Sequence, residues 1–226
     1  WQELVFSETN LQSRLTGLLA LTRVGSPALK SRLLEALNAL SWNTLSGEQQ
    51  LDYLRVYSLT FIRMGEPSDP EREVALATLN PLFPKQDRFQ NVELCQLLCY
   101  LQSPDAAAKS VLLLEGAPSQ EEQIDYAKSM RLLRAGWTED LQKRYFFWFV
   151  KAAAYRGGAS FQKFVDAINN DALSMLSDGQ KVAMKDILGA EPSIQSPLEA
   201  IAARSFVKEW SASELQRALS TSLKKG

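Results

Sequence analysis

The chain has 226 residues, 46% of them hydrophobic, and its 25 basic and 26 acidic side chains leave a formal net charge of −1. Such a hydrophobic share supplies a core for one domain or one block of a repeat array, and it excludes a disordered chain. The near-neutral balance gives no basic excess for binding nucleic acid. No apolar run approaches the roughly 20 residues that a membrane helix needs, so we expect no membrane insertion by this segment.

The first ten residues, WQELVFSETN, lack the basic and apolar regions of a secretory signal. Because the chain begins with Trp1, we expect it to be a piece of a longer protein from which the targeting segment has been removed.

Helix signals follow one another through the first half of the chain. Leucines recur at helical spacing near the start, and Ser26 followed by proline favours an N-cap and a first helical turn. A serine followed three residues later by Gln or Glu is typical of a capping box, as at Ser46 and Ser68. The helices expected there are 8–24, 26–41, 46–64 and 68–79.

The second half continues in the same way after an interruption. The prolines in PLFPKQDRFQ predict the longest loop, at 81–90, and GAEPSIQSP predicts a second break at 189–197. Serines at 103, 119, 177 and 211 are placed to cap further helices, and the last helix would end in two lysines, which suit a helix C-terminus. The helices expected there are 92–102, 103–116, 119–135, two within 137–176, 177–188 and 211–225.

The stretch 137–176 predicts two buried helices joined by a tight corner at Gly157 and Gly158. We expect Gly157 to adopt a positive φ at the end of the first helix and Ser160 to cap the second. The aromatic side chains of this stretch recur at helical spacing, which favours core packing over a platform for stacking sugars or bases. The predicted core aromatics are Trp137, Tyr145, Phe146, Trp148, Phe149, Phe161 and Phe164.

No run of alternating β-branched residues predicts a strand, so we expect an all-α fold. Helix pairs recur roughly every 40 residues, which favours a HEAT- or armadillo-like stack of antiparallel pairs, an α-α superhelix. A compact helical bundle is the alternative. We expect a helical-repeat domain at 1–190, and at 191–226 a linker and terminal helix that lead toward a downstream domain absent from this chain.

The sequence offers no catalytic motif. It contains no histidine, which removes the commonest general base and the usual triads, and it lacks the glycine-rich phosphate motifs and the G-x-S-x-G elbow. Carboxylate pairs at 121–122 and 139–140 sit at expected helix starts, where capping and the helix dipole explain them. Two carboxylates from distant helices could still form a glycosidase site, but nothing in the sequence points to one. Because the known motifs are missing, we expect no catalytic, cofactor-binding or metal-binding residue in this segment.

Three further side chains have a plain structural interpretation. Cys95 and Cys99 lie one helical turn apart on an apolar helix, too close along it for an unstrained disulfide and without a third ligand for a metal. We expect them to be buried free thiols. Arg156, beside the glycine corner, could bind an anion, but a solvated or carbonyl-capping role at a helix C-terminus is favoured.

Several strings of residues resemble a known family. They are FIRMGEPS, LNPLFPKQDRFQNVELCQLLCYLQSP, APSQEEQIDYAKSMRLLRAGWTEDLQKRYFFWF and AAAYRGGASFQKFVDAINNDALSML. The residues of these strings and their order resemble those of the helical, HEAT-like region of PVC-type haem-binding proteins, which are membrane-bound dehydrogenase-like c-type cytochromes. The tail RSFVKEWSASELQRALSTSLKKG resembles the linker into their haem domain. The resemblance covers roughly 18–226.

This resemblance implies an extracytoplasmic, periplasmic location, and a parent protein with a sugar-dehydrogenase-type β-propeller upstream and a cytochrome c domain downstream. The chain itself has no C-x-x-C-H motif, so haem c is expected only in that downstream domain. The resemblance supplies no catalytic residue for this segment.

Three functional hypotheses follow. The first is a non-catalytic helical-repeat module that spaces or docks domains or protein partners, such as the propeller and the cytochrome c domain of the parent protein. The second is an all-helical carbohydrate-binding or carbohydrate-active domain. The third is a cytosolic adaptor unrelated to haem. We favour the first, because the sequence shows helices at a regular spacing and no catalytic motif.

Overall fold

The computed structural model describes residues 1–190 and 211–216. The chain divides into two compact units, Trp1–Pro192 and Ser193–Gly226, and each is described by itself. In the second unit, Ser211 Oγ accepts a hydrogen bond from Glu214 N at 3.3 Å and caps a short helical segment at 212–216. The linker expected from 191 and the lysine-rich helix end lie outside the described residues.

The described part of the chain contains helices and no strand, so the all-α fold predicted from the sequence is confirmed. None of these helices is long and apolar enough to cross a membrane. In chain order the α-helices of the first unit are α1 (Gln2–Ser7), α2 (Leu11–Val24), α3 (Lys30–Asn38), α4 (Gly47–Met64), α5 (Asp69–Leu79), α6 (Arg88–Tyr100), α7 (Ala106–Gly116), α8 (Gln120–Met130), α9 (Glu139–Ala152), α10 (Phe161–Ser174), α11 (Asp178–Ala183) and α12 (Lys185–Leu188).

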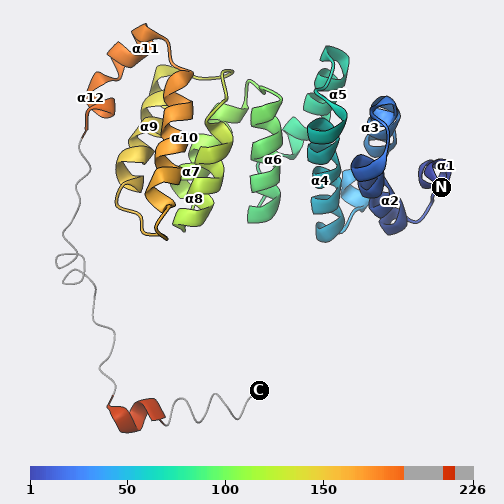
Figure 1. The fold of residues 1–226 in the computed structure, drawn as a ribbon, viewed down its shortest axis with the longest axis horizontal. Helices are drawn as coiled ribbons and strands as arrows, with labels where there is room; N and C mark the ends of the chain where they lie inside the picture. The colour runs from blue at the N-terminus through green and yellow to red at the C-terminus, as the bar shows by residue number, and fades with distance from the viewer. Residues whose placement is uncertain (191–210, 217–226) are drawn as a thin grey trace. The chain divides into compact units, whose positions relative to one another are not determined.

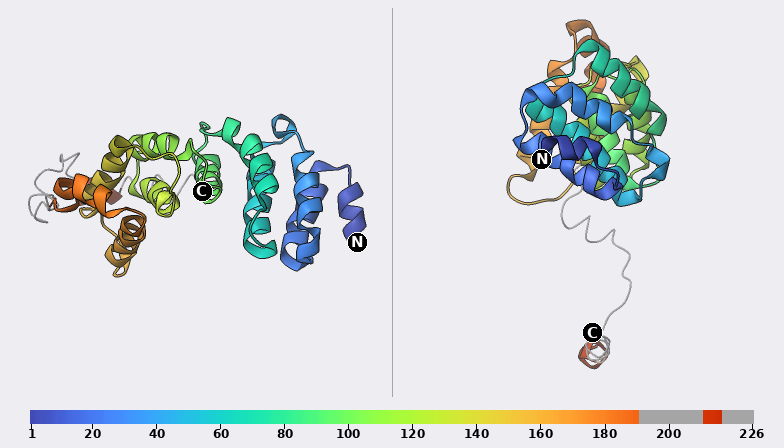
Figure 2. Two further views of the ribbon diagram at one scale, coloured as in Figure 1. Left: turned by 90° about the horizontal axis from the view of Figure 1, so that it is seen from above. Right: turned by 90° about the vertical axis from the view of Figure 1, so that its right-hand side faces the viewer.

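The helices of the first unit lie side by side in two layers (Figures 1 and 2). Every second helix belongs to the first layer, in which α2 packs on α4, α4 on α6, α6 on α8 and α8 on α10. The intervening helices α3, α5, α7 and α9 form the second layer, where α3 contacts α5 and α7 contacts α9. The core runs between the two layers as one cluster of buried side chains.

Several hydrogen bonds between successive first-layer helices join residues 40 or 41 positions apart, and Arg88 pairs with Asp125 across 37. Gln90 Nε2 donates to Gln50 Oε1 at 2.8 Å across 40 residues. Arg131 Nε donates to Asp171 Oδ2 at 3.0 Å, also across 40 residues. Arg63 Nε donates to the backbone oxygen of Thr22 at 3.1 Å across 41 residues. Each step from one first-layer helix to the next therefore advances the chain by a similar length.

Serine caps set many of the helix starts. Complete capping boxes, with both reciprocal hydrogen bonds, are present at Ser46, Ser68 and Ser177. Ser119 accepts from Glu122 N at 3.3 Å but lacks the return bond, because the Glu122 carboxylate binds the Tyr126 hydroxyl instead. Local sequence therefore determines these starts, as expected for caps.

Other helix boundaries differ from the sequence-based prediction. The helix expected at 8–24 begins only at Leu11, because Asn10 Oδ1 accepts from Ser13 N at 3.0 Å and starts α2 there, and α1 before it was not expected. The helix expected from residue 92 begins at Arg88, because Asp87 Oδ1 accepts from Gln90 N at 2.8 Å.

The predicted glycine corner is wrong in its details. Helix α9 ends at Ala152, several residues before Gly157, and positive-φ glycines in the described residues are Gly65 and Gly136. Ser160 occupies the N-cap position of α10 but its side chain makes no capping hydrogen bond. Gly157 is needed for another reason. A Cβ there would lie 2.6 Å from Phe161 Cβ, whereas a Cβ at 158 would meet nothing within 4 Å.

Most aromatic side chains of α9 lie in the core, and Phe147 is the exposed one. Tyr145, Phe146, Trp148 and Phe149 are buried, and Tyr145 Oη donates to the backbone oxygen of Ala127 at 2.8 Å, which ties α9 to α8. Of the other predicted core aromatics, two pack partly buried against the core, namely Trp137 and Phe161.

Phe164 is 43% exposed, contrary to its predicted place in the core. It lies on α10, the last first-layer helix among the described residues, so no further helix of that layer covers its outer side.

Candidate binding groove

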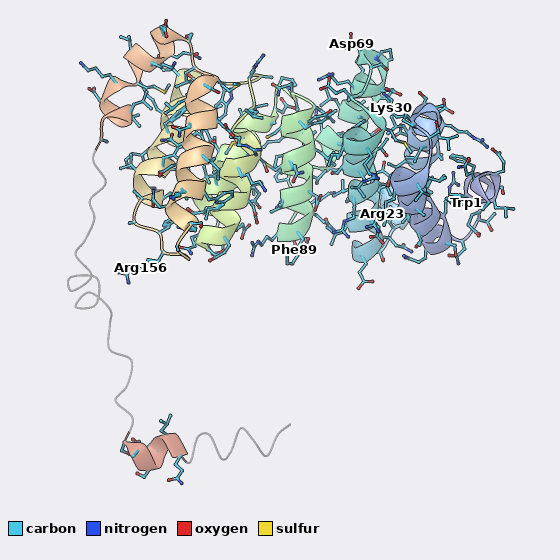
Figure 3. The ribbon with its side chains drawn as sticks, viewed as in Figure 1. Trp1, Arg23, Lys30, Asp69, Phe89 and Arg156 are labelled. Carbon is cyan, nitrogen blue, oxygen red and sulfur yellow. The ribbon has the colours of Figure 1, made fainter. Side chains whose placement is uncertain are left out.

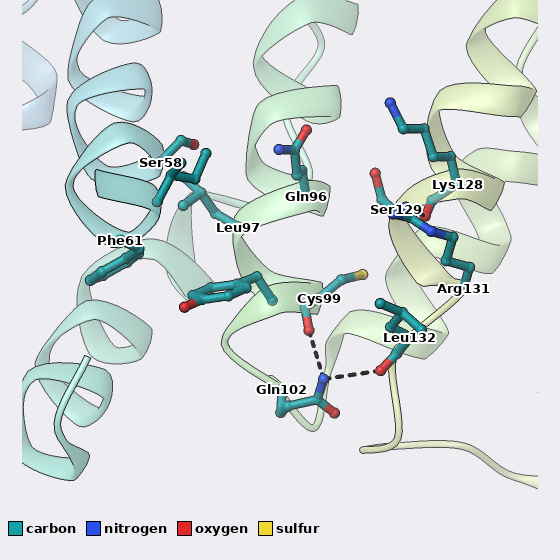
Figure 4. A pocket seen from close by; sticks show the side chains of 12 residues that line it. Ser58, Phe61, Gln96, Leu97, Cys99, Gln102, Lys128, Ser129, Arg131 and Leu132 are labelled. Atoms are coloured by element: carbon teal, nitrogen blue, oxygen red, sulfur yellow. Dashed lines mark hydrogen bonds between the residues drawn. The ribbon is translucent and has the colours of Figure 1, made fainter. Parts of the chain in front are cut away.

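Three neighbouring first-layer helices enclose a cavity of about 560 Å³, which we call the α6 groove (Figure 4). Helix α6 provides its floor, while α4 and α8 provide its two walls. The volume lies within the usual range for ligand sites. The lining residues are Ser58, Phe61, Ile62, Gln96, Leu97, Cys99, Tyr100, Gln102, Lys128, Ser129, Arg131 and Leu132.

The floor of the α6 groove is apolar and its rim is open. Phe61 and Tyr100 stack with ring centroids 5.8 Å apart and an interplanar angle of 25°. Helices α4 and α6 and the turn after α8 each contribute an exposed apolar side chain: Ile62 is 71% exposed, Tyr100 43% and Leu132 49%. Apolar side chains gathered on one open surface are typical of contact sites for other molecules, whereas single scattered ones are not.

One end of the groove is closed by Gln102, a residue in an unusual backbone conformation. Its φ is 59°, in the left-handed region that normally favours glycine. Gln102 N donates to Cys99 O at 3.1 Å and Ser103 N to Leu98 O at 2.9 Å, which is the hydrogen-bond pattern of a Schellman C-cap.

The Gln102 side chain connects the ends of two helices. Its Nε2 donates to the backbone oxygens of Cys99 at 3.1 Å and Leu132 at 3.2 Å, as the dashed lines in Figure 4 show. Its Oε1 accepts from Arg134 N at 2.8 Å. These three bonds hold the end of α6 against the turn that follows α8, and they fix the width of the groove at that point.

The charge of the lining is positive, because it contains Lys128 and Arg131 and no carboxylate. Arg131 is held by Asp171 at 3.0 Å. Among the described residues, Lys128 Nζ makes no ion pair. On the opposite wall, Ser58 Oγ is buried and has no hydrogen-bond partner in the described part of the chain. Glu93 of α6 lies outside the lining, where burial raises its pKa and the charge of Arg55 opposes that shift.

One of the two cysteines, Cys99, lines this groove, and Cys95 lies next to it on α6. Cys95 and Cys99 are free and buried, as predicted, with their Sγ atoms 4.0 Å apart. The hydrogen bond with Cys95 and burial raise the pKa of Cys99 well above its usual 9.0, so this thiol stays protonated at neutral pH and is a poor nucleophile. No group of His, Cys, Asp or Glu in the described residues could hold a metal ion.

The other residues singled out from the sequence lie elsewhere. Arg156 projects outward from the loop between α9 and α10, and its backbone oxygen accepts from Gln120 Nε2 at 2.8 Å (Figure 3). The carboxylates of Glu139 and Asp140 pair within their own helix, with Lys143 at 2.5 Å and Arg144 at 3.4 Å. The structure brings none of these residues into the α6 groove.

Apart from Cys99, the residues that line the groove were not singled out from the sequence. The sequence pattern does not distinguish Ile62, Tyr100 and Leu132 from ordinary apolar positions of helices. Their exposure depends on how three helices pack. A weak signal existed, since Tyr100 and Leu132 stand at the expected ends of apolar helices, next to turns.

The chain was compared with protein-family models, with curated proteins and with solved structures, and none of the three comparisons found a match. The geometry of the groove therefore provides the basis for a functional assignment.

Proposed function

We propose that this chain is a non-catalytic helical-repeat module of the HEAT-like type, which docks a protein partner or a neighbouring domain through the α6 groove. The observation that carries the proposal is the exposure of Ile62, Tyr100 and Leu132 around one open, apolar cavity. A monomeric surface gains nothing from gathering such side chains, whereas a docking surface buries them when its partner arrives.

The regular stack supports the same proposal. First-layer helices joined by hydrogen bonds across about the same number of residues form an extended surface, and helical repeats use such surfaces for binding. The exposed Ile62 comes from α4 and Leu132 from the turn after α8, on either side of α6, so one partner would contact three successive helices of the layer or their ends.

We further propose that the module belongs to a larger, multidomain c-type cytochrome of the dehydrogenase-like type, in the periplasm or otherwise outside the cytoplasm. The support for this setting is the resemblance of the strings GWT, YFFWF and YRGGASF, which occur in order between residues 136 and 161. The neighbours to be docked would then be a β-propeller and a cytochrome c domain, and only the latter would carry haem c.

The setting is tested by the visible absorption of the full-length parent, produced in a host that matures c-type haem. We expect a reduced-minus-oxidised c-type spectrum from the parent and none from the 226-residue chain alone. A parent without haem would remove the cytochrome setting and leave a helical adaptor.

The docking role is tested separately. The purified cytochrome c domain or propeller of the parent is titrated against the chain and against a variant with Ile62→Ser and Leu132→Ser. We expect binding that the double change weakens by about tenfold or more, since both side chains lose apolar contact area. Binding that is unaffected by the double change would show that docking uses another surface.

An all-helical carbohydrate-binding domain is the second candidate. The exposed face of Tyr100, stacked on Phe61 and close to the amides of Gln96 and Gln102, favours it, because sugars stack on aromatic rings. The groove lining offers no pair of carboxylates for glycoside cleavage. Calorimetric titration with a panel of oligosaccharides distinguishes the two candidate functions. Saturable binding that Tyr100→Ala abolishes would favour the carbohydrate-binding domain over the docking module.

A further inference from the structure

Two polar groups on opposite walls of the α6 groove lack partners in the described part of the chain. Lys128 Nζ, on α8, makes no ion pair there, and Ser58 Oγ, on α4, is buried without a hydrogen bond. Figure 4 shows Ser58 and Lys128 on the two sides of α6, with Gln96 and Leu97 between them. Because the Ser58 hydroxyl is shielded and the Lys128 side chain is exposed, Lys128 is the one of the two that a ligand in the groove can reach.

The charge of the groove selects the ligand. The lining has two cations and no carboxylate, but Arg131 is already bound to Asp171 at 3.0 Å. One cation, Lys128, is therefore available. A single ammonium group suits a single carboxylate, whereas phosphate recognition typically uses bidentate arginine or several cations.

The rim of the groove selects the size of the ligand. A small carboxylate amphiphile, such as a fatty acid, binds where most of its surface is enclosed. Here the exposed fractions of Ile62, Tyr100 and Leu132 lie between 43% and 71%. A partner protein covers such a rim with its own surface and excludes water from it, as happens around the hot spots of protein interfaces.

We propose that the α6 groove binds an apolar segment of a partner protein that carries an Asp or Glu side chain, whose carboxylate pairs with Lys128. An apolar side chain of the segment lies against Tyr100, between Ile62 and Leu132. This inference rests on the proposed docking function and adds the chemistry of the partner.

The experiment uses the whole 226-residue chain and a library of random peptides displayed on phage. We expect the chain to enrich peptides in which large apolar residues flank Asp or Glu. An enriched peptide and its uncharged counterpart, with Gln or Asn in place of the acid, are then titrated by calorimetry against the wild-type chain and two variants. Lys128→Met keeps the aliphatic stem and removes the charge, and Lys163→Met removes an exposed charge on α10 as the matched control.

Removal of either the peptide acid or the Lys128 charge is expected to weaken binding by about tenfold. Removal of both should weaken it by no more than one of them alone, because the two charges act as a pair. Lys163→Met should leave the affinity unchanged. Since Lys128 is exposed, all variants should keep the wild-type circular dichroism and thermal midpoint.

The contrary outcomes separate the two proposals. One outcome is that peptides without an acid bind the chain, that Lys128→Met leaves their affinity unchanged, and that Ile62→Ser weakens it. This outcome would overturn the carboxylate pairing but not the docking function. The docking function would be overturned as well if no peptide were enriched, or if neither Lys128→Met nor Ile62→Ser changed the affinity for the enriched peptides. Displacement of the peptides by oleate, with oleate binding dependent on Lys128, would assign the groove to a small amphiphile instead.

Discussion

At Gln102 one side chain determines how α6 ends and how the groove is closed. The backbone adopts a φ of 59°, which costs a non-glycine residue about 1 kcal/mol or more. Three side-chain hydrogen bonds, to Cys99, Leu132 and Arg134, offset this strain. Each contributes about 0.5–1.5 kcal/mol. The Gln102 side chain therefore stabilises a backbone conformation that a residue with a Cβ disfavours.

We predict that Gln102→Ala lowers the free energy of unfolding by about 1–3 kcal/mol, because it loses the three bonds and keeps the strain. Gln102→Gly loses the same bonds but relieves the strain, so it should be more stable than the alanine variant by about 1 kcal/mol. Urea unfolding of the two variants measures this difference. Equal stabilities would contradict a left-handed backbone at this position.

Gly157 is fixed by proximity rather than by its own backbone conformation. A Cβ there would lie 2.6 Å from Phe161 Cβ, near the root of that side chain, where a change of rotamer gives little relief. We predict that Gly157→Val destabilises the fold by roughly 1–3 kcal/mol. Gly158→Val, next to it, meets nothing within 4 Å and should stay within about 0.5 kcal/mol of the wild type. Thermal unfolding of the pair checks both values, and similar losses at the two positions would refute the close approach.

At the scale of elements, Glu71 joins two neighbouring helices of the second layer. It lies in the first turn of α5, where its carboxylate accepts from Ser68 N at 2.8 Å. It also pairs with Lys30 of α3 at 3.0 Å and accepts from Ser31 Oγ at 2.9 Å. Burial opposes ionisation of this carboxyl group, but the hydrogen bonds from Ser68, Lys30 and Ser31 outweigh it and lower the pKa of Glu71 from 4.5 to about 2.

A lowered folded-state pKa makes stability depend on pH in a definite direction. The ionised Glu71 contributes its stabilisation above the unfolded-state pKa, near 4.5, and the contribution falls as pH drops toward 2. We predict that Glu71→Gln costs about 1–2 kcal/mol at pH 7 and much less near pH 2.5. Urea unfolding of both proteins at several pH values gives the comparison. A difference that does not change with pH would contradict the lowered pKa.

The sequence predicted elements well where local residues determine them. The boxes at Ser46 and Ser68 need only a serine and an acceptor three residues later, so both starts were predicted. It failed where a distant group decides. The left-handed turn at Gln102 depends on Leu132 and Arg134, which follow in a later helix and its turn, and the role of Gly157 depends on the position of one ring.

For the whole molecule, the repeating pattern predicted the all-α stack because apolar periodicity and short links leave few other arrangements. The groove was beyond that pattern. The packing of α4, α6 and α8 determines whether Ile62, Tyr100 and Leu132 face a neighbour or solvent. The sequence pattern of an apolar residue is the same in both cases.

We predict that stability falls from the middle of the stack toward its ends. The terminal helices α1, α11 and α12 contain no buried residue, whereas α4 and α6 bury many. In a stack each helix is stabilised mainly by its neighbours, so the ends open first. Hydrogen exchange followed by mass spectrometry should show early exchange in the three terminal helices and late exchange in α4 and α6. Uniform protection across residues 1–190 would instead indicate a single all-or-none unit.

The bonds that cross the first layer at 40 or 41 residues have a consequence for the evolution of the chain. An insertion or deletion of one whole helix pair leaves the packing of each remaining helix on its neighbours unchanged, whereas one within a helix turns the following side chains away from their partners. Neighbouring helix axes lie about 8–10 Å apart. A gain or loss of one helix pair therefore lengthens or shortens the two layers by about that distance.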